Sequence, residues 1–113
     1  MLPPKRQKPK KRDERWRSQS HLTFIHKHQC SVSGCTTLPI HAHHVKRDSD
    51  GGMGRKPSDY HCISLCAIHH DEIHKGEETF ERKHSVDVRV LADAFAKESP
   101  KRMEIAQHKQ ERA

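Results

Sequence analysis

The chain has 113 residues and a net charge of +7, and only 31% of its residues are hydrophobic. A chain of this length forms one domain, and so few apolar residues predict a thin core that needs a metal ion or disulfides for stability. No apolar run is long enough to cross a membrane, which argues against an integral membrane protein.

The positive charge is concentrated near the N-terminus. Residues 1–17 contain eight Lys or Arg against two acidic residues. We expect residues 1–15 to form a disordered basic arm that attracts a polyanion, with nucleic acid as the expected partner. The alternative is a solvated tail that only improves solubility. The candidate phosphate-binding residues of the arm are Lys5, Arg6, Lys10, Lys11 and Arg12.

The same N-terminal segment lacks the apolar stretch of a signal peptide. We therefore expect an intracellular, reducing compartment, in which the four cysteines act as metal thiolates. The alternative is a secreted protein in which the cysteines form two disulfides.

After the arm, the pattern of apolar and turn residues predicts an α+β fold. Residues 16–28 form a short helix or strand, and residues 38–45 form a strand that ends at a pair of histidines. A glycine-bearing loop (46–58) is too short for a crossover helix, so a second strand (59–65) runs antiparallel to the first. Helices follow at 66–75 and 86–98. We assign residues 16–100 to the domain and residues 101–113 to a polar, fraying helix or tail.

Cysteines and one histidine have the spacing of a structural zinc site. Cys30 and Cys35 flank Gly34, which permits the tight turn that brings two thiolates together. Cys66 and His69 share one stripe of the following helix. Cys30, Cys35, Cys66 and His69 thus suit a closed tetrahedral zinc site. Cys62 could replace one of these ligands, but within a strand it fits better as a small core residue.

A second group consists of histidines alone. His70 and His74 lie one helical turn apart, whereas His43 and His44 point to opposite faces of their strand. One of this strand pair can ligate a cation with His70 and His74, while the other stays free as a base with a pKa near neutrality. Hydrolysis of a phosphodiester uses both a cation and a base. Any single histidine could also be an ordinary core or surface residue. His41 shares a strand face with His43, so it could be an extra ligand, although a position merely near this group fits better.

This order of motifs resembles the HNH nucleases, whose ββα-metal finger has the same sequence of parts. The resemblance rests on Ala42-His43-His44-Val45, the glycine-bearing loop and Leu65-Cys66-x-x-His69-His70. Residues 52–59 and 65–76 are also similar to the phage and prophage branch typified by the Ref recombination-enhancement nucleases. The resemblance covers about residues 22–100. It implies a small zinc-stapled ββα-metal domain with additional C-terminal helices.

The resemblance also implies roles for individual residues. His44 corresponds to the general base, and His43, His70 and His74 correspond to the ligands of a catalytic divalent ion. His61 stands where the family has an asparagine that orients the base, which is a departure from the pattern. The family resemblance implies Mg²⁺, although three imidazole ligands favour Mn²⁺ or Zn²⁺.

The loop supplies the remaining candidates. Arg55 and Lys56 can form a cationic fork for a phosphate, or they can be a solvated turn. Asp59 is expected to orient a ligand imidazole from outside the ligand set.

Together these features predict a DNA endonuclease of low sequence specificity. The resemblance links it to the bacterial or phage cytoplasm and to a recombination protein as partner. The rival prediction is a non-catalytic zinc-finger module that binds nucleic acid. The oligomeric state and the preference for single or double strands are left open.

Overall fold

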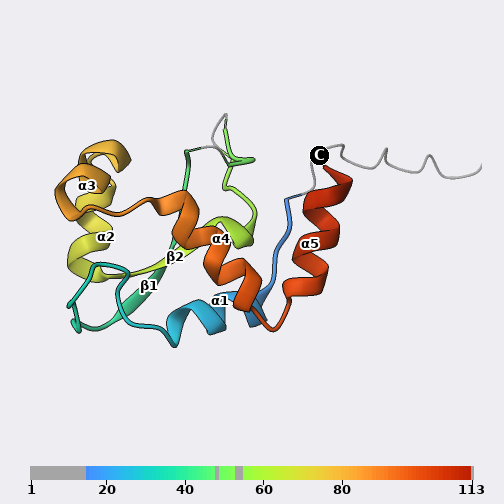
Figure 1. The fold of residues 1–113 in the computed structure, drawn as a ribbon, viewed down its shortest axis with the longest axis horizontal. Helices are drawn as coiled ribbons and strands as arrows, with labels where there is room; N and C mark the ends of the chain where they lie inside the picture. The colour runs from blue at the N-terminus through green and yellow to red at the C-terminus, as the bar shows by residue number, and fades with distance from the viewer. Residues whose placement is uncertain (1–14, 48, 53–54, 113) are drawn as a thin grey trace, which may run out of the picture.

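The computed structural model describes residues 15–47, 49–52 and 55–112. Helix α1 (Gln19–His26) is followed by strand β1 (Ile40–His44), and the short 3-10 helix η1 (Asp59–His61) leads into strand β2 (Cys62–Cys66). The chain continues through α2 (Ala67–Ile73), α3 (Glu77–His84), α4 (Val88–Glu98) and α5 (Arg102–Glu111). In Figure 1, α2 and α3 lie at one end of the molecule and α5 at the other, with α4 between them. The predicted α+β class is confirmed.

The two strands pair antiparallel, as the connection between them requires. Ile40 lies opposite Cys66, and His44 lies opposite Cys62. Strand β2 is buried along its whole length, whereas β1 alternates in part between buried and half-buried positions. Helices α1 and α4 both pack against the sheet. The histidines of β1 therefore project from a strand that neighbouring elements hold in place.

Most buried apolar side chains belong to one cluster around the sheet, and a smaller cluster lies under α5. The main cluster contains Cys30, Ile40, Val45, Ile63, Leu65, Cys66, Ile73, Phe80, Val88 and Ala92. The smaller one contains Tyr60, Ala96 and Ile105, with Trp16 packed against them. Both clusters are small, as the composition predicts. None of the helices in the described ranges has the length and apolar content that crossing a bilayer requires.

Capping side chains fix where two of the helices begin. The Ser18 hydroxyl accepts a hydrogen bond from the His21 N–H at 3.2 Å, so the ambiguous segment 16–28 contains a helix. The Asp87 carboxylate accepts hydrogen bonds from the first turn of α4. That helix therefore starts at Val88, two residues later than the apolar pattern predicts.

Two further segments differ from the predicted elements. Residues 59–61 form η1 rather than the start of the second strand, because the His61 N–H bonds to the Ser58 carbonyl at 3.0 Å. The last helix begins at Arg102 and is not wholly polar, since Ile105 is only 2% exposed. Packing against η1 and α4 thus holds an end of the chain that sequence alone suggests would fray.

Helix α3 is an element that the sequence reasoning missed. Phe80 is its buried residue, so no apolar period marks the segment. The available signal is electrostatic, since acidic residues in the first turn and basic residues in the last turn match the helix dipole. These are Glu77 and Glu78 at the start and Arg82, Lys83 and His84 at the end.

A buried histidine joins α1 to the turn between α4 and α5. His21 and Ser99 are both 0% exposed, and His21 Nδ1 lies 2.7 Å from Ser99 Oγ. Burial lowers the pKa of His21 to about 4, although the charge of Asp59 acts in the opposite direction. The imidazole is therefore neutral in the folded protein at pH values where it is protonated in the unfolded chain.

This pair predicts a loss of stability in acid. Below an unfolded pKa of about 6.5, the unfolded chain binds a proton that folded His21 binds only near pH 4, so the free energy of unfolding falls as the pH drops through that window. The expected contribution is about 3 kcal/mol. Urea unfolding at several pH values should show a shallower pH dependence for His21→Gln. The exposed His26 of the same helix supplies the control, and an unchanged slope in His21→Gln would contradict the assignment.

Candidate active site and metal centres

The predicted Cys3His group is brought together. Cys30, Cys35, Cys66 and His69 each offer one ligand atom, and these atoms lie within 4.8 Å of one another. His69 Nδ1 is 3.3 Å from Cys30 Sγ and 3.2 Å from Cys66 Sγ, and the sulfurs of Cys35 and Cys66 are 3.8 Å apart. Sulfurs bound at about 2.3 Å to one tetrahedral zinc lie about 3.8 Å apart, so the group fits zinc. All four cysteines are free thiols, and three of them converge with His69 in an arrangement that favours the metal interpretation over the disulfide alternative.

Local sequence positions each of these ligands. Gly34 has a φ of +78° between the two cysteines of the loop, as its place in the sequence predicts. The loop is tied to the sheet because the Ser31 N–H donates to the Ser64 carbonyl at 2.8 Å. Cys66 is the N-cap of α2, where its sulfur accepts from the His69 N–H at 3.4 Å. One residue thus ends the strand, caps the helix and faces the other ligands.

The thiols of this region differ in how readily they ionise. Burial raises the pKa of the Cys30 thiol to about 11, so it needs a cation beside it to become a thiolate ligand. Hydrogen bonds from Thr37 lower the pKa of Cys35. Burial also raises the pKa of Cys62, which is 0% exposed and lies outside the ligand group. Cys62 therefore behaves as the small core residue that its strand position favours.

Three histidines form a second group. His43 of β1 joins His70 of α2 and its C-cap His74, with one ligand atom from each lying within 4.8 Å of the others. Nε2 of His70 and Nε2 of His74 are 3.1 Å apart across one helical turn. Imidazole nitrogens bound at about 2.0 Å to one tetrahedral ion lie about 3.3 Å apart, so these rings can share a cation. The donor set of three imidazoles leaves a further coordination position for water or substrate.

His41 contacts this group through His70. The Nδ1 atoms of His41 and His70 are 2.9 Å apart, so Nε2 of His70 is the nitrogen left to face His74. His41 itself is outside the ligand group. Burial and the neighbouring imidazoles of His43, His74 and His41 lower the pKa of His70 to about 4. The ring is therefore neutral at pH 7, which is the form that binds a metal.

His44 lies apart from the three ligands and pairs with a carboxylate. Its Nε2 is 2.9 Å from Asp59 Oδ1, and the Ser18 N–H donates to Asp59 Oδ2 at 2.8 Å. Burial alone would raise the pKa of Asp59, but these hydrogen bonds and the charges of His44 and Arg17 bring it below its usual value. Asp59 was expected to orient a ligand imidazole. It instead contacts the neighbouring histidine, since consecutive residues of β1 face opposite sides.

His61 is not among the residues that line the histidine site. Its Nε2 lies 3.8 Å from Asp50 Oδ1, on the side of α5, and burial lowers its pKa. Its backbone contacts the end of β1, because the Val45 N–H donates to the His61 carbonyl at 2.7 Å. That bond holds the strand end directly after His44.

A cavity of about 710 Å³ brings together six of the candidate residues. It is lined by the histidines of the second group, by His44 and by the loop cations Arg55 and Lys56. The backbone at Lys56 is tied to the segment before α1, since the guanidinium of Arg17 donates to the Lys56 carbonyl at 2.9 Å. The predicted phosphate-binding residues Lys5, Arg6, Lys10, Lys11 and Arg12 lie outside the described residues. The cavity thus brings together a group of three imidazoles, a histidine that pairs with a carboxylate, and cationic residues that include Arg55 and Lys56.

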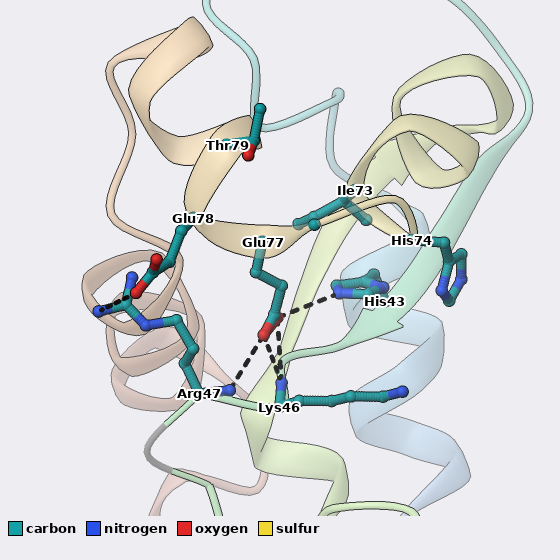
Figure 2. Close-up of a pocket in the computed structure, with 9 residues that line it drawn as sticks. His43, Lys46, Arg47, Ile73, His74, Glu77, Glu78 and Thr79 are labelled. Carbon is teal, nitrogen blue, oxygen red and sulfur yellow. Dashed lines mark hydrogen bonds and ion pairs between the residues drawn. The ribbon is translucent and has the colours of Figure 1, made fainter.

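Glu77 is a residue of the site that the sequence reasoning missed. It begins α3 and lines a second cavity, of about 500 Å³, that shares His43 and His74 with the first. Its carboxylate accepts hydrogen bonds from the backbone N–H groups of Lys46 and Arg47 and lies near His43 (Figure 2). Burial raises the pKa of Glu77, and its contacts with His43 and these amides more than offset that rise. The signal that could have found it is its position three residues after His74.

A third group combines His69 with Glu72 and His84. His84 Nε2 lies 2.6 Å from Glu72 Oε1, and Lys83 Nζ lies 3.3 Å from the same oxygen. The hydrogen bond from His84 lowers the pKa of Glu72. The carboxylate therefore already has cationic partners, and we interpret it as support for the helix that bears His69 rather than as an ion site.

Comparison with known proteins gives a family without a described activity. The model described as "Protein of unknown function (DUF968)" matches residues 3–100. The uncharacterized protein YdfU of Escherichia coli (strain K12) is 30% identical over 84 residues, which are 74% of this chain. The match covers 23% of YdfU, so this chain spans less than a quarter of that relative. No solved structure matches the chain. Because the family model covers most of its length, the chain belongs to the DUF968 family of proteins of unknown function.

Proposed function

We propose that this chain is a divalent-metal-dependent DNA endonuclease that hydrolyses phosphodiester bonds with little sequence preference. One observation carries the proposal. Three imidazoles that can share an ion and a fourth imidazole paired with a carboxylate line the same cavity as two cationic side chains. The carboxylate-paired histidine and the set of only three imidazole ligands favour a hydrolytic site over a purely structural one.

The described residues support distinct steps of this chemistry. His43, His70 and His74 would hold a divalent ion, which when bound would stabilise charge on the phosphate and the leaving oxygen. Asp59 holds Nε2 of His44, which leaves Nδ1 of that ring to accept a proton from the attacking water. The Asp59 carboxylate also stabilises the imidazolium that this transfer creates.

Other residues act on the substrate or on the base. Arg55 and Lys56 suit contacts to a phosphate, and contacts of this kind carry affinity without reading sequence. The His61 backbone carbonyl steadies the strand beside His44. In this proposal the side chain of His61 does not take over the role of the asparagine that orients the base in HNH nucleases.

The resemblance of residues 22–100 to the HNH nucleases supports the same activity. It suggests Mg²⁺ as the ion, whereas the three imidazoles favour Mn²⁺ or Zn²⁺. A role in phage or prophage recombination, a recombination protein as partner and a cytoplasmic location belong to the same proposal.

Plasmid nicking tests the proposal. The zinc-loaded full chain should convert supercoiled plasmid to open-circular DNA in Mn²⁺ or Mg²⁺, and excess chelator should stop the reaction. His70→Ala should lose the activity because it removes the imidazole that contacts both His43 and His74. His28→Ala is the matched control, because it alters a histidine that contacts Phe24 edge to face and does not line the cavity.

The negative result has a clear meaning. A folded chain that holds one zinc and nicks no DNA in Mg²⁺, Mn²⁺, Co²⁺ or Zn²⁺ would contradict the proposal. That outcome would support the rival, a zinc-finger module that binds nucleic acid without cutting it.

A further inference from the structure

The carboxylate of Glu77 is held rigidly beside the proposed catalytic ion site. Oε2 accepts from the Lys46 N–H at 3.0 Å, and Oε1 accepts from the Arg47 N–H at 3.0 Å. These amides follow the end of β1, so Glu77 ties α3 to the strand that bears His43 and His44. The Glu77 side chain is 13% exposed. A carboxylate fixed in this way has a defined direction rather than a mobile one.

His43 presents an unsatisfied nitrogen to this carboxylate. Its side chain is 4% exposed, and Nε2 is buried without a hydrogen-bond partner among the described residues. Glu77 Oε2 lies 3.6 Å from that nitrogen, just beyond hydrogen-bond reach. A buried ring nitrogen without a partner is costly, so a small closure towards Glu77 is favourable. In Figure 2 the ring of His43 lies between Glu77 and His74.

The buried nitrogen is poorly placed to be the metal ligand. An ion that acts on substrate must reach the cavity shared with Arg55 and Lys56, whereas Nε2 of His43 is closed off from solvent. The opposite ring nitrogen, Nδ1, is then the one available to the ion. Metal-binding histidines commonly donate their second N–H to a carboxylate, which fixes the tautomer and strengthens the ligand.

We propose that Glu77 is a positioning residue that accepts the Nε2 proton of His43 and so presents Nδ1 of that ring to the catalytic ion. This inference rests on the proposed function, because it assumes that His43, His70 and His74 share an ion. It adds a charged partner on α3 to a site otherwise built from β1 and α2. It also explains why α3 begins directly beside the strand end.

The test is metal affinity at the histidine site. Co²⁺ is titrated into the chain that already holds one zinc, and its binding to imidazoles is followed by visible absorption. Co²⁺ in the cysteine site would be recognised by its thiolate charge-transfer bands. Glu77→Gln keeps an oxygen for the amides of Lys46 and Arg47 but removes the charge. We expect this variant to bind the second ion with about 10- to 100-fold lower affinity while one zinc stays bound.

The control lies on the same helical turn. Glu78 is 72% exposed and only approaches Arg47, at 4.0 Å, so Glu78→Gln should leave the affinity for the second ion unchanged. If Glu77→Gln binds the second ion as tightly as the unaltered chain, the positioning role is wrong and the nuclease proposal still stands. If the unaltered chain binds no second ion, both proposals fail.

A second measurement does not depend on any variant folding. The ¹⁵N chemical shifts of the histidine rings, recorded on the full chain with two equivalents of Zn²⁺, report which nitrogen of each ring is protonated. The proposal requires a proton on Nε2 of His43 and metal at Nδ1. Metal at Nε2 of His43 would overturn it.

Discussion

Replacing Cys66 with alanine is expected to unfold the domain. Cys66 is 0% exposed, joins both strand and helix ends and offers a sulfur to the Cys3His group. Structural zinc typically contributes about 10–16 kcal/mol of apparent binding free energy, which exceeds or equals the whole stability of most domains. The two apolar clusters are too small to replace it. Far-UV circular dichroism and zinc stoichiometry should both show the loss.

Cys62 is the matched control for that experiment. It is equally buried on the same strand but lies outside the ligand group. Cys62→Ala should retain one zinc and the folded spectrum, at a cost of about 1 kcal/mol for the vacated space. A Cys66→Ala chain that stays folded without zinc would show that the core alone stabilises the domain.

Replacing His44 with alanine should lower the rate of plasmid nicking by about 10²- to 10⁴-fold. The reason is the separation of roles at the strand end, where His44 pairs with Asp59 and is absent from the group of ion ligands. Zinc content, affinity for a second ion and the unfolding midpoint should change little. Single-turnover nicking measured beside these binding data separates a lost base from a lost ligand.

His108 supplies the control, because it bonds to Tyr60 Oη at 2.9 Å on α5 and does not line the cavity. His108→Ala should keep its nicking rate. Full activity in His44→Ala would show that this residue is not the base. A lower affinity of that variant for the second ion would instead show that His44 is a ligand.

The Cys3His group and the histidine group were accessible to sequence reasoning because metal chemistry restricts both residue type and spacing. Thiolates and imidazoles two to five positions apart can meet only in a few ways, so Cys30, Cys35, Cys66 and His69 could be grouped before any coordinates. The strand period likewise separates His43 from His44, and the structure places them in different environments.

Other features depend on contacts between distant segments, which spacing does not encode. Asp59 is held beside His44 by its contacts with Ser18 and Arg17, which lie about 40 residues earlier in the chain. Helix α3 has no apolar stripe, so its position beside β1, and with it the role of Glu77, becomes visible only in three dimensions. Residues 59–61 turn into η1 through the bond from the His61 N–H to the Ser58 carbonyl, and the Asp59 side chain of that turn contacts both the Ser18 N–H and His44.

Helix α2 carries consecutive residues of two different centres, with His69 in the cysteine group and His70 in the histidine group. Such adjacency couples the two groups, because both depend on how the first turn of α2 is oriented. If both groups bind metal as we propose, an ion held by the cysteine group would therefore also help to align His70 and His74 with their partner across the sheet.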